Sequence, residues 1–303
     1  MPQDIVLMDG ATGTALRDRG VEVPSHITSI WSAQALLSDP DAVVALHRDY
    51  IEVGADLVTV NNYAVTPPLL RREGLEGRFD ELTTLAVDLA WRARDEADAG
   101  GREVRIAGSV PPLETSYRAD LVGDDEVILA DYRQLVAALA PRVDILLVET
   151  MASAREAVAA VTAAAESDCS IWLSWTLMGD RPGELPSGES LEQAFEAVKP
   201  LDDRISAYMV NCCGANFVGA AIPVLAALTD KPVGGYANSA NTLPAREGAA
   251  RKGPGEFEFE VLDTDGYAKS VAGWLDAGAR VVGGCCYTSP AHVGRLRALI
   301  DAR

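Results

Sequence analysis

The chain has 303 residues, of which 48% are hydrophobic and 23% are charged, with a formal net charge of −19. These values are typical of a soluble globular protein with a sizeable core, and the negative charge argues against nucleic acid or an anionic membrane surface as a partner. No apolar run approaches the roughly 20 residues that span a bilayer, and the N-terminus lacks the features of a signal peptide. Four of the five cysteines lie in two adjacent pairs, which is a poor disulfide framework and predicts a reducing, cytoplasmic location.

Short apolar runs recur along the whole chain, and a helical pattern follows each of them. The runs are near-continuous Val, Ile, Leu and Ala, which is typical of parallel strands covered on both faces. The predicted strands are Ile5–Gly10, Leu57–Asn62, Arg105–Val110, Ile145–Thr150, Ser170–Leu177, Ala207–Cys213, Pro232–Asn238 and Val281–Cys286. The predicted helices include Asp41–Gly54, Phe79–Ala99, Asp124–Pro141, Ser153–Glu166 and Thr264–Gly278.

Eight strand–helix units in about 300 residues predict an α/β fold, a (β/α)8 TIM barrel that forms a single domain over residues 1–303. An open doubly wound sheet is the alternative, but it usually carries a Gly-rich phosphate-binding turn, and the sequence has none. The stretch from Arg246 to Glu260 is rich in Gly and charge. We interpret it either as a mobile lid or as a disordered surface loop.

Polar residues stand at the ends of the predicted strands, and in a barrel these ends meet at one mouth. Asp9 and Glu149 are interpreted as carboxylates that pair with the ammonium group of an amino-acid substrate. The alternatives are an ordinary Asp-Gly turn for Asp9 and a cap of the helix that begins at Ser153 for Glu149. Asn211 and Asn238 are candidates either for substrate binding or for tying loops together.

Two cysteine clusters end the sixth and eighth predicted strands, at Cys212-Cys213 and at Gly283-Gly284-Cys285-Cys286. Three thiolates about 2.3 Å from a zinc ion leave the fourth tetrahedral position open, as a catalytic site requires. Adjacent residues of a regular strand point to opposite faces, so the two glycines are expected to let the backbone bend toward one ion. Cys212 would be the third ligand, with Cys213 as its rival; the alternative is a set of buried cysteines without a metal.

These residues resemble the motifs of the homocysteine S-methyltransferase family, from the first predicted strand to the last. The resemblance implies a zinc-dependent TIM barrel in which Cys212, Cys285 and Cys286 bind Zn²⁺. It also implies that Asp9 and Glu149 hold the amino group of the substrate. The matching segments are 9–14, 31–33, 47–50, 54–56, 61–63, 149–150, 211–212 and 283–286.

The expected reaction is the transfer of a methyl group from a sulfonium, S-methylmethionine or S-adenosylmethionine, to the zinc-bound thiolate of homocysteine, which gives methionine. Zinc deprotonates a thiol that it binds, and the negative charge of three cysteinates favours a cationic donor. Trp31 and Tyr63 are candidates for an aromatic wall beside that donor. The expected partners are therefore two small molecules. The alternatives are a methyltransferase for another thiol or a selenol, such as selenocysteine, and a non-catalytic protein that senses zinc or oxidants.

Overall fold

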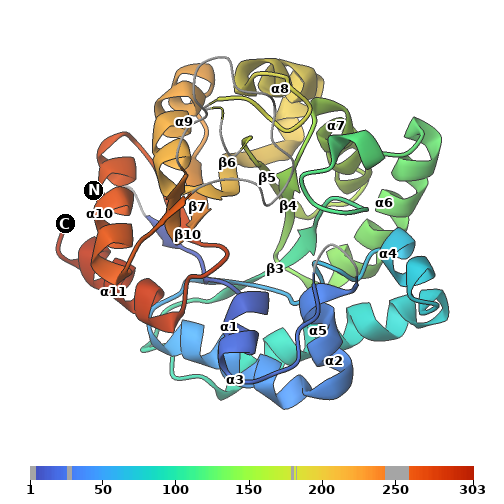
Figure 1. Cartoon of the computed structure of the whole chain (residues 1–303), viewed down its shortest axis with the longest axis horizontal. Coiled ribbons are helices and arrows are strands. Elements are labelled where there is room, and N and C mark those ends of the chain that lie inside the picture. The colour runs from blue at the N-terminus through green and yellow to red at the C-terminus, as the bar shows by residue number, and fades with distance from the viewer. Residues whose placement is uncertain (1–4, 26–28, 179–180, 182, 243–258) are drawn as a thin grey trace.

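The computed structural model describes residues 5–25, 29–178, 181, 183–242 and 259–303. Its central element is a ring of eight parallel strands with helices outside it (Figure 1). The barrel strands are β1 (Val6–Leu7), β2 (Leu57–Thr59), β3 (Arg105–Val110), β4 (Ile145–Met151), β5 (Ser170–Trp175), β6 (Ile205–Gly214), β7 (Val233–Asn238) and β10 (Val281–Gly284). Their order is β1-β10-β7-β6-β5-β4-β3-β2, and a bridge between Met8 and Leu57 joins the first strand to the second. The predicted (β/α)8 barrel is confirmed.

A helix follows each barrel strand and packs on the outside of the ring (Figure 1). These helices are α3 (Pro40–Glu52), α5 (Phe79–Glu96), α6 (Asp125–Leu139), α7 (Ala154–Ala164), α8 (Leu191–Val198), α9 (Ala215–Leu228), α10 (Thr264–Asp276) and α11 (Pro290–Asp301). Shorter helices are α1 (Gly13–Asp18), α2 (Gln34–Ser38) and α4 (Pro67–Arg72). Among the described residues, no helix is long and apolar enough to cross a membrane.

Local chemistry sets the ends of these helices. The Asp39 carboxylate accepts the N–H of Ala42 at 3.1 Å, and Pro40 occupies the first turn of α3, as expected for an N-cap. Gly54 and Gly278, which follow α3 and α10, have φ values of 123° and 107°. Glycine takes this conformation without strain, so each of the two turns the chain from a helix into the next strand.

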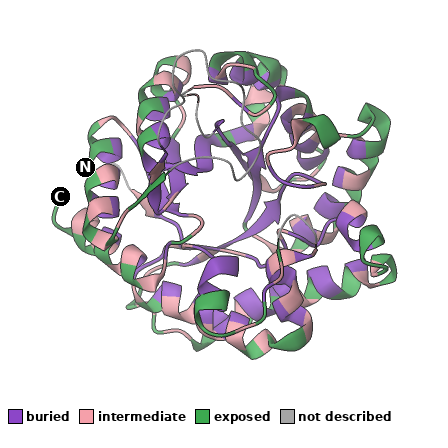
Figure 2. Ribbon diagram, viewed as in Figure 1, coloured by how far each residue is buried: buried purple, intermediate pink, exposed green. Residues whose placement is uncertain are grey.

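The buried hydrophobic residues form two clusters, one inside the barrel and one between the strands and the helices. Figure 2 shows that the strands and the inward parts of the helices are buried. The larger, outer layer joins the outward side chains of the strands to the inward faces of the helices. The inner layer fills the barrel below the mouth. Its members are Met8, Leu57, Ala107, Ile145, Leu147, Trp172, Ala207, Met209, Tyr236 and Val281.

The first two strands end earlier than the sequence pattern predicts. The Asp9 carboxylate accepts the backbone N–H of Thr59 at 2.8 Å, and the N–H of Asn62 bonds to the carbonyl of Val60 at 2.7 Å. Side-chain and turn hydrogen bonds therefore replace the strand ladder at the barrel mouth. The antiparallel pair β8 (Ala240–Thr242) and β9 (Phe259–Val261) follows β7. Most of the stretch predicted as a lid or loop, 246–258, lies outside the described residues.

Candidate metal and substrate site

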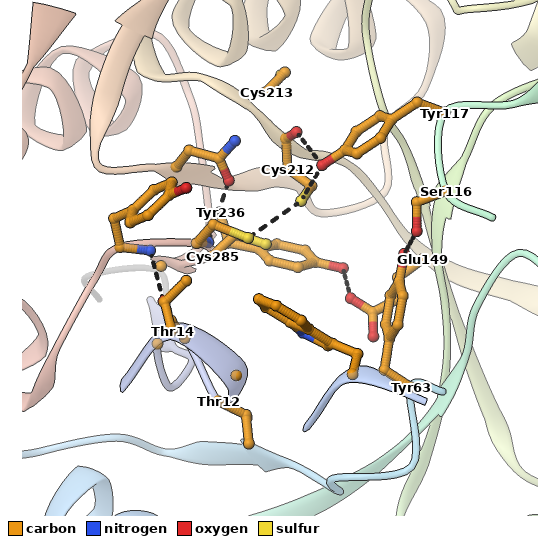
Figure 3. A pocket seen from close by; sticks show the side chains of 18 of the residues that line it. Thr12, Thr14, Tyr63, Ser116, Tyr117, Glu149, Cys212, Cys213, Tyr236 and Cys285 are labelled. Atoms are coloured by element: carbon orange, nitrogen blue, oxygen red, sulfur yellow. Dashed lines mark hydrogen bonds between the residues drawn. The ribbon is translucent and has the colours of Figure 1, made fainter. Parts of the chain in front are cut away.

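A cavity of about 520 Å³ opens at the C-terminal ends of the barrel strands, where the active sites of (β/α)8 barrels lie. Its wall comes mainly from the loops that follow the strands (Figure 3). Six of the seven residues predicted as metal or substrate ligands line this cavity. They are Asp9, Glu149, Cys212, Asn238, Cys285 and Cys286.

Three cysteines form a compact sulfur cluster in the cavity wall. The Sγ atoms of Cys212, Cys285 and Cys286 lie within 4.8 Å of one another, and those of Cys212 and Cys286 are 4.0 Å apart. Three sulfurs bound to a tetrahedral zinc ion at 2.3 Å would be about 3.8 Å apart, so the cluster fits such an ion with small adjustments. Hydrogen bonds from Cys212 and Cys285 hold the pKa of Cys286 well below its usual range. Hydrogen bonds within the cluster and burial raise the pKa values of Cys212 and Cys285. The metal-free cluster therefore favours one thiolate, and a bound metal would have to displace the protons of the other two sulfurs.

A break in strand β6 directs Cys212 toward the cluster. The pairing of β6 with β7 shifts register between Asn211 and Gly214, and Cys212 has a φ of 56°, which is uncommon for a residue other than glycine. The next residue, Cys213, packs in the outer layer of the core, as alternation along the strand predicts. Burial raises the pKa of Cys213 to about 12, and its sulfur is not part of the group of three that lie within 4.8 Å of one another.

The two glycines before Cys285 allow neighbouring parts of the chain to pack closely against the backbone. A Cβ atom at Gly283 would lie 2.6 Å from that of Met8, and one at Gly284 would lie 2.2 Å from Oγ1 of Thr288. Neither glycine has a positive φ; the left-handed residue of this turn is Tyr287, with a φ of 65°. The strand ends at Gly284 and both following sulfurs reach one cluster; bending at the glycines themselves stays a prediction.

The loop after β1 is hydrogen-bonded to this cysteine turn. Oγ1 of Thr288 donates to the carbonyl of Cys285 at 2.7 Å and accepts the N–H of Ala11 at 3.1 Å. Oγ1 of Thr14 accepts the N–H of Tyr287 at 2.9 Å. The Asp-Gly-Ala-Thr-Gly-Thr motif thus holds the turn that carries two of the three sulfurs.

Asp9 and Glu149 are buried carboxylates in the wall of the cavity. Asp9 accepts hydrogen bonds from the N–H and hydroxyl of Thr59 at 2.8 and 3.3 Å. Glu149 accepts the hydroxyls of Ser109 at 2.5 Å and Tyr236 at 3.1 Å. Burial raises the pKa of Asp9 to about 8 and that of Glu149 to about 7.

The raised pKa values indicate that this end of the cavity favours a cation. No cationic side chain among the described residues forms an ion pair with Asp9 or Glu149. Their negative charges are desolvated and near each other, and a bound ammonium group would relieve both costs. Glu149 does not cap α7, because the Ser153 side chain accepts the N–H of Glu156 there.

Asn211 and Asn238 hold the site together through their amide groups. Oδ1 of Asn211 accepts the N–H of Thr150 at 2.9 Å, and its Nδ2 donates to Oγ1 of Thr150 at 2.8 Å. This pair links the residue before Cys212 to the residue after Glu149, and Asn211 is not among the described residues that line the cavity. Oδ1 of Asn238 accepts the N–H of Cys286 at 3.2 Å. The contacts correspond to the loop-tying alternative; direct substrate binding by either residue stays a prediction.

Sequence reasoning missed two tyrosine hydroxyl groups, of Tyr117 and Tyr236, that contact the site residues. Ser109 and Tyr236 bond to Glu149, and the Tyr117 hydroxyl lies 2.8 Å from Sγ of Cys212. Tyr117 and Cys212 are 95 residues apart in the chain. Ser109 stands at a predicted strand end, which marked it as a mouth residue, but no local feature of the sequence distinguishes the two tyrosines.

Comparison with known proteins identifies the family to which this site belongs. The family model described as homocysteine S-methyltransferase matches residues 6–300. The chain belongs to the homocysteine S-methyltransferase family. The homocysteine S-methyltransferase of Escherichia coli K12 is 30% identical to this chain, and the match covers 98% of this chain and 95% of the E. coli protein. The selenocysteine methyltransferase of Astragalus bisulcatus is also 30% identical, over 97% of this chain and 91% of its own length.

A solved structure from the same family has the same barrel. The metallated form of the homocysteine methyltransferase MmuM from Escherichia coli matches with a TM-score of 0.81 and 28% identity, over 98% of this chain and 97% of its own. Its oxidized form matches with a TM-score of 0.82.

Proposed function

We propose that the protein transfers a methyl group from a sulfonium donor, S-methylmethionine or S-adenosylmethionine, to homocysteine, which gives methionine. Membership of the family supports the reaction class. The observation that carries the proposal is the three-sulfur cluster at the wall of a cavity that also contains two desolvated carboxylates. We further propose a cytoplasmic enzyme with one catalytic domain over residues 1–303.

Cys212, Cys285 and Cys286 are the proposed ligands of a zinc ion. Bound zinc would supply a substrate thiol that is deprotonated at neutral pH, when a free thiol with a pKa of about 8.5 is mostly protonated. Thiolate ligands are soft donors that suit zinc, and the cluster offers three of them. Their charge leaves an electron-rich site that favours a cationic methyl donor over a neutral one.

Asp9 and Glu149 are the proposed ligands of the substrate ammonium group. Both carboxylates are held by hydroxyl and amide donors from neighbouring strands, so their positions are fixed before substrate arrives. Asn211 and Asn238 then set the distance between these carboxylates and the sulfurs. Fixing the ammonium group at one end of the cavity orients the substrate sulfur toward the cysteines at the other.

The aromatic wall of the cavity suits a sulfonium. Trp31, Tyr63, Tyr117 and Tyr236 all line it, and aromatic faces attract cations in partly desolvated sites. Arg17 packs over Trp31, with 4.9 Å between its Cζ and the ring centroid. The aromatic side chains would also limit the access of water to the reacting sulfur.

The test is the formation of labelled methionine from homocysteine by reduced, zinc-replete protein. S-methylmethionine, S-adenosylmethionine and betaine are supplied separately, each with a distinguishable methyl label, and the product is detected by mass spectrometry. The proposal predicts label from a sulfonium donor. Label from betaine alone would contradict the choice of donor. Label in methylselenocysteine but not in methionine, when both acceptors are offered, would favour the selenocysteine alternative.

A further inference from the structure

The loop after β3 presents a tyrosine hydroxyl to one cysteine of the sulfur cluster. Tyr117 lies with its hydroxyl 2.8 Å from Sγ of Cys212 and 3.2 Å from the carbonyl oxygen of the same residue (Figure 3). Tyr117 has a φ of 67°, a conformation that costs about 1 kcal/mol or more in a residue other than glycine. The fold thus keeps Tyr117 in a left-handed backbone conformation, and the side chain of this residue contacts the sulfur of Cys212.

Buried hydrogen bonds fix the loop that carries Tyr117. The N–H of Leu113 donates to the Glu156 carboxylate at 3.2 Å, and its carbonyl accepts the hydroxyl of Thr66 at 2.7 Å. Closer to Tyr117, the hydroxyls of Ser116 and Tyr63 are 2.8 Å apart. The segment before Tyr117 is therefore tied to two other parts of the barrel, the loop after β2 and helix α7.

The direction of the Tyr117 hydrogen bond is fixed when Cys212 serves as a metal ligand, because a ligating cysteine is a thiolate. A cysteine thiolate has no proton and can only accept, so the phenol must donate to it. A hydrogen bond to a thiolate withdraws electron density from the sulfur and makes that sulfur a poorer nucleophile.

A reactive methyl donor can also methylate the cysteine ligands of such a site. Attack by Cys212 on a sulfonium would form a new carbon–sulfur bond at Cys212 and break the bond between methyl carbon and donor sulfur. The electron pair of that bond would leave with a neutral thioether. The methylated cysteine would be a neutral thioether too, and it would no longer be a thiolate ligand. Methyl transfer to the substrate therefore requires that the substrate sulfur be more nucleophilic than the cysteine sulfurs of the protein.

We propose that Tyr117 is a positioning residue whose hydrogen bond suppresses methylation of Cys212 and so directs the methyl group to the substrate sulfur. The role rests on the proposed function, but the hydrogen bond can be tested without it. Among the described residues, the hydroxyl contact to a cluster sulfur comes from Tyr117 and goes to Cys212. Cys285 and Cys286 thus serve as internal references in the same molecule.

The experiment exposes reduced, zinc-loaded protein to deuterated iodomethane, which needs neither homocysteine nor a sulfonium. Iodide is the leaving group, and peptide mass spectrometry compares methylation of Cys212 with that of the Cys285–Cys286 peptide. Tyr117→Phe should raise the relative methylation of Cys212 about 3–10-fold, as expected for the loss of one hydrogen bond. An unchanged ratio would overturn the proposal, whether or not the protein makes methionine.

Thr176 provides a matched control. Its hydroxyl contacts the carbonyl oxygen of Cys212 at 3.4 Å, so Thr176→Val removes a contact to the backbone and leaves the sulfur contact in place. The ratio should stay near the wild-type value in this variant. An equal rise in both variants would overturn the proposal, because the hydroxyls would then act by positioning the backbone.

Tyr117→His supplies a second variant, because a ring N–H can replace the hydroxyl as donor. The methylation ratio should return toward the wild-type value, and a ratio as high as that of Tyr117→Phe would contradict the proposal. Zinc content is measured for every variant by native mass spectrometry. Loss of zinc from Tyr117→Phe would also overturn the proposal, because the hydroxyl would then govern metal affinity.

Discussion

Replacing Glu149 by glutamine should stabilise the metal-free protein at high pH. Burial raises the pKa of this carboxyl from 4.5 to about 7. At 1.36 kcal/mol for each tenfold change, ionising Glu149 in the folded chain costs about 3 kcal/mol more than in the unfolded chain. Because the pKa of Glu149 is raised in the folded chain, the stability contributed by its protonated carboxyl is fully present below pH 4.5. This contribution is lost as the pH rises through 7. Glutamine carries no charge and avoids this loss.

The assay is urea unfolding of reduced, metal-free wild type and Glu149→Gln at several pH values. The difference in unfolding free energy should shift in favour of the variant by about 2 kcal/mol between pH 5.5 and pH 8. Its absolute value also includes altered hydrogen bonds to Ser109 and Tyr236, so the change with pH is the diagnostic quantity. The same substitution should weaken methionine binding, because it removes a carboxylate that we propose binds the ammonium group.

Glu81 offers a control for the Glu149 measurement. It is an exposed carboxylate whose pKa is lowered by a hydrogen bond from Arg78. Its titration therefore lies below the pH range of the assay, and Glu81→Gln should give a stability difference that is constant from pH 5.5 to pH 8. A constant difference for Glu149→Gln as well would refute the account of Glu149 as a destabilised carboxylate kept for binding a cation.

Two further substitutions test the scaffold of the site. Gly284→Ala would place a Cβ 2.2 Å from Oγ1 of Thr288. It should therefore lower the free energy of unfolding in urea by about 1–3 kcal/mol and weaken zinc retention against a chelator. The control is Gly273→Ala in α10, where a Cβ would have nothing within 4 Å; it should stabilise the protein by about 0.5–1 kcal/mol. Equal effects of the two would contradict the packing argument. Asn211→Ala should cost about 2–3 kcal/mol by leaving polar groups of Thr150 unpaired. It should also weaken methionine binding in calorimetry, and an unchanged affinity would show that the link between β4 and β6 does not position Glu149.

The barrel could be predicted because the sequence patterns of its strands and helices are repeated along the chain. Each strand is a short apolar run and each helix has one apolar face, so eight repeats identify the fold without knowledge of any single contact. The ends of β1 and β2 could not be predicted from the same pattern. There, the side chain of Asp9 takes the N–H of Thr59, and a turn at Asn62 replaces the ladder.

The sulfur cluster was accessible to sequence reasoning because its members stand at strand ends. In a parallel barrel all such ends converge, so Cys212 and the Cys285–Cys286 pair had to approach one another. The hydroxyl of Tyr117 was not accessible in this way. Its position depends on a left-handed backbone in a loop and on contacts with residues remote in sequence, and no local pattern encodes either one.

The most direct test of the central claim is zinc-edge X-ray absorption of the reduced protein before and after addition of homocysteine. The account predicts about three sulfur ligands and one light-atom ligand in the zinc-loaded protein, and four sulfur ligands once homocysteine is present. The coordination should return to three sulfurs when homocysteine is replaced by an analogue without a thiol. Four sulfur ligands that are the same with and without homocysteine would contradict the account and indicate a closed structural site.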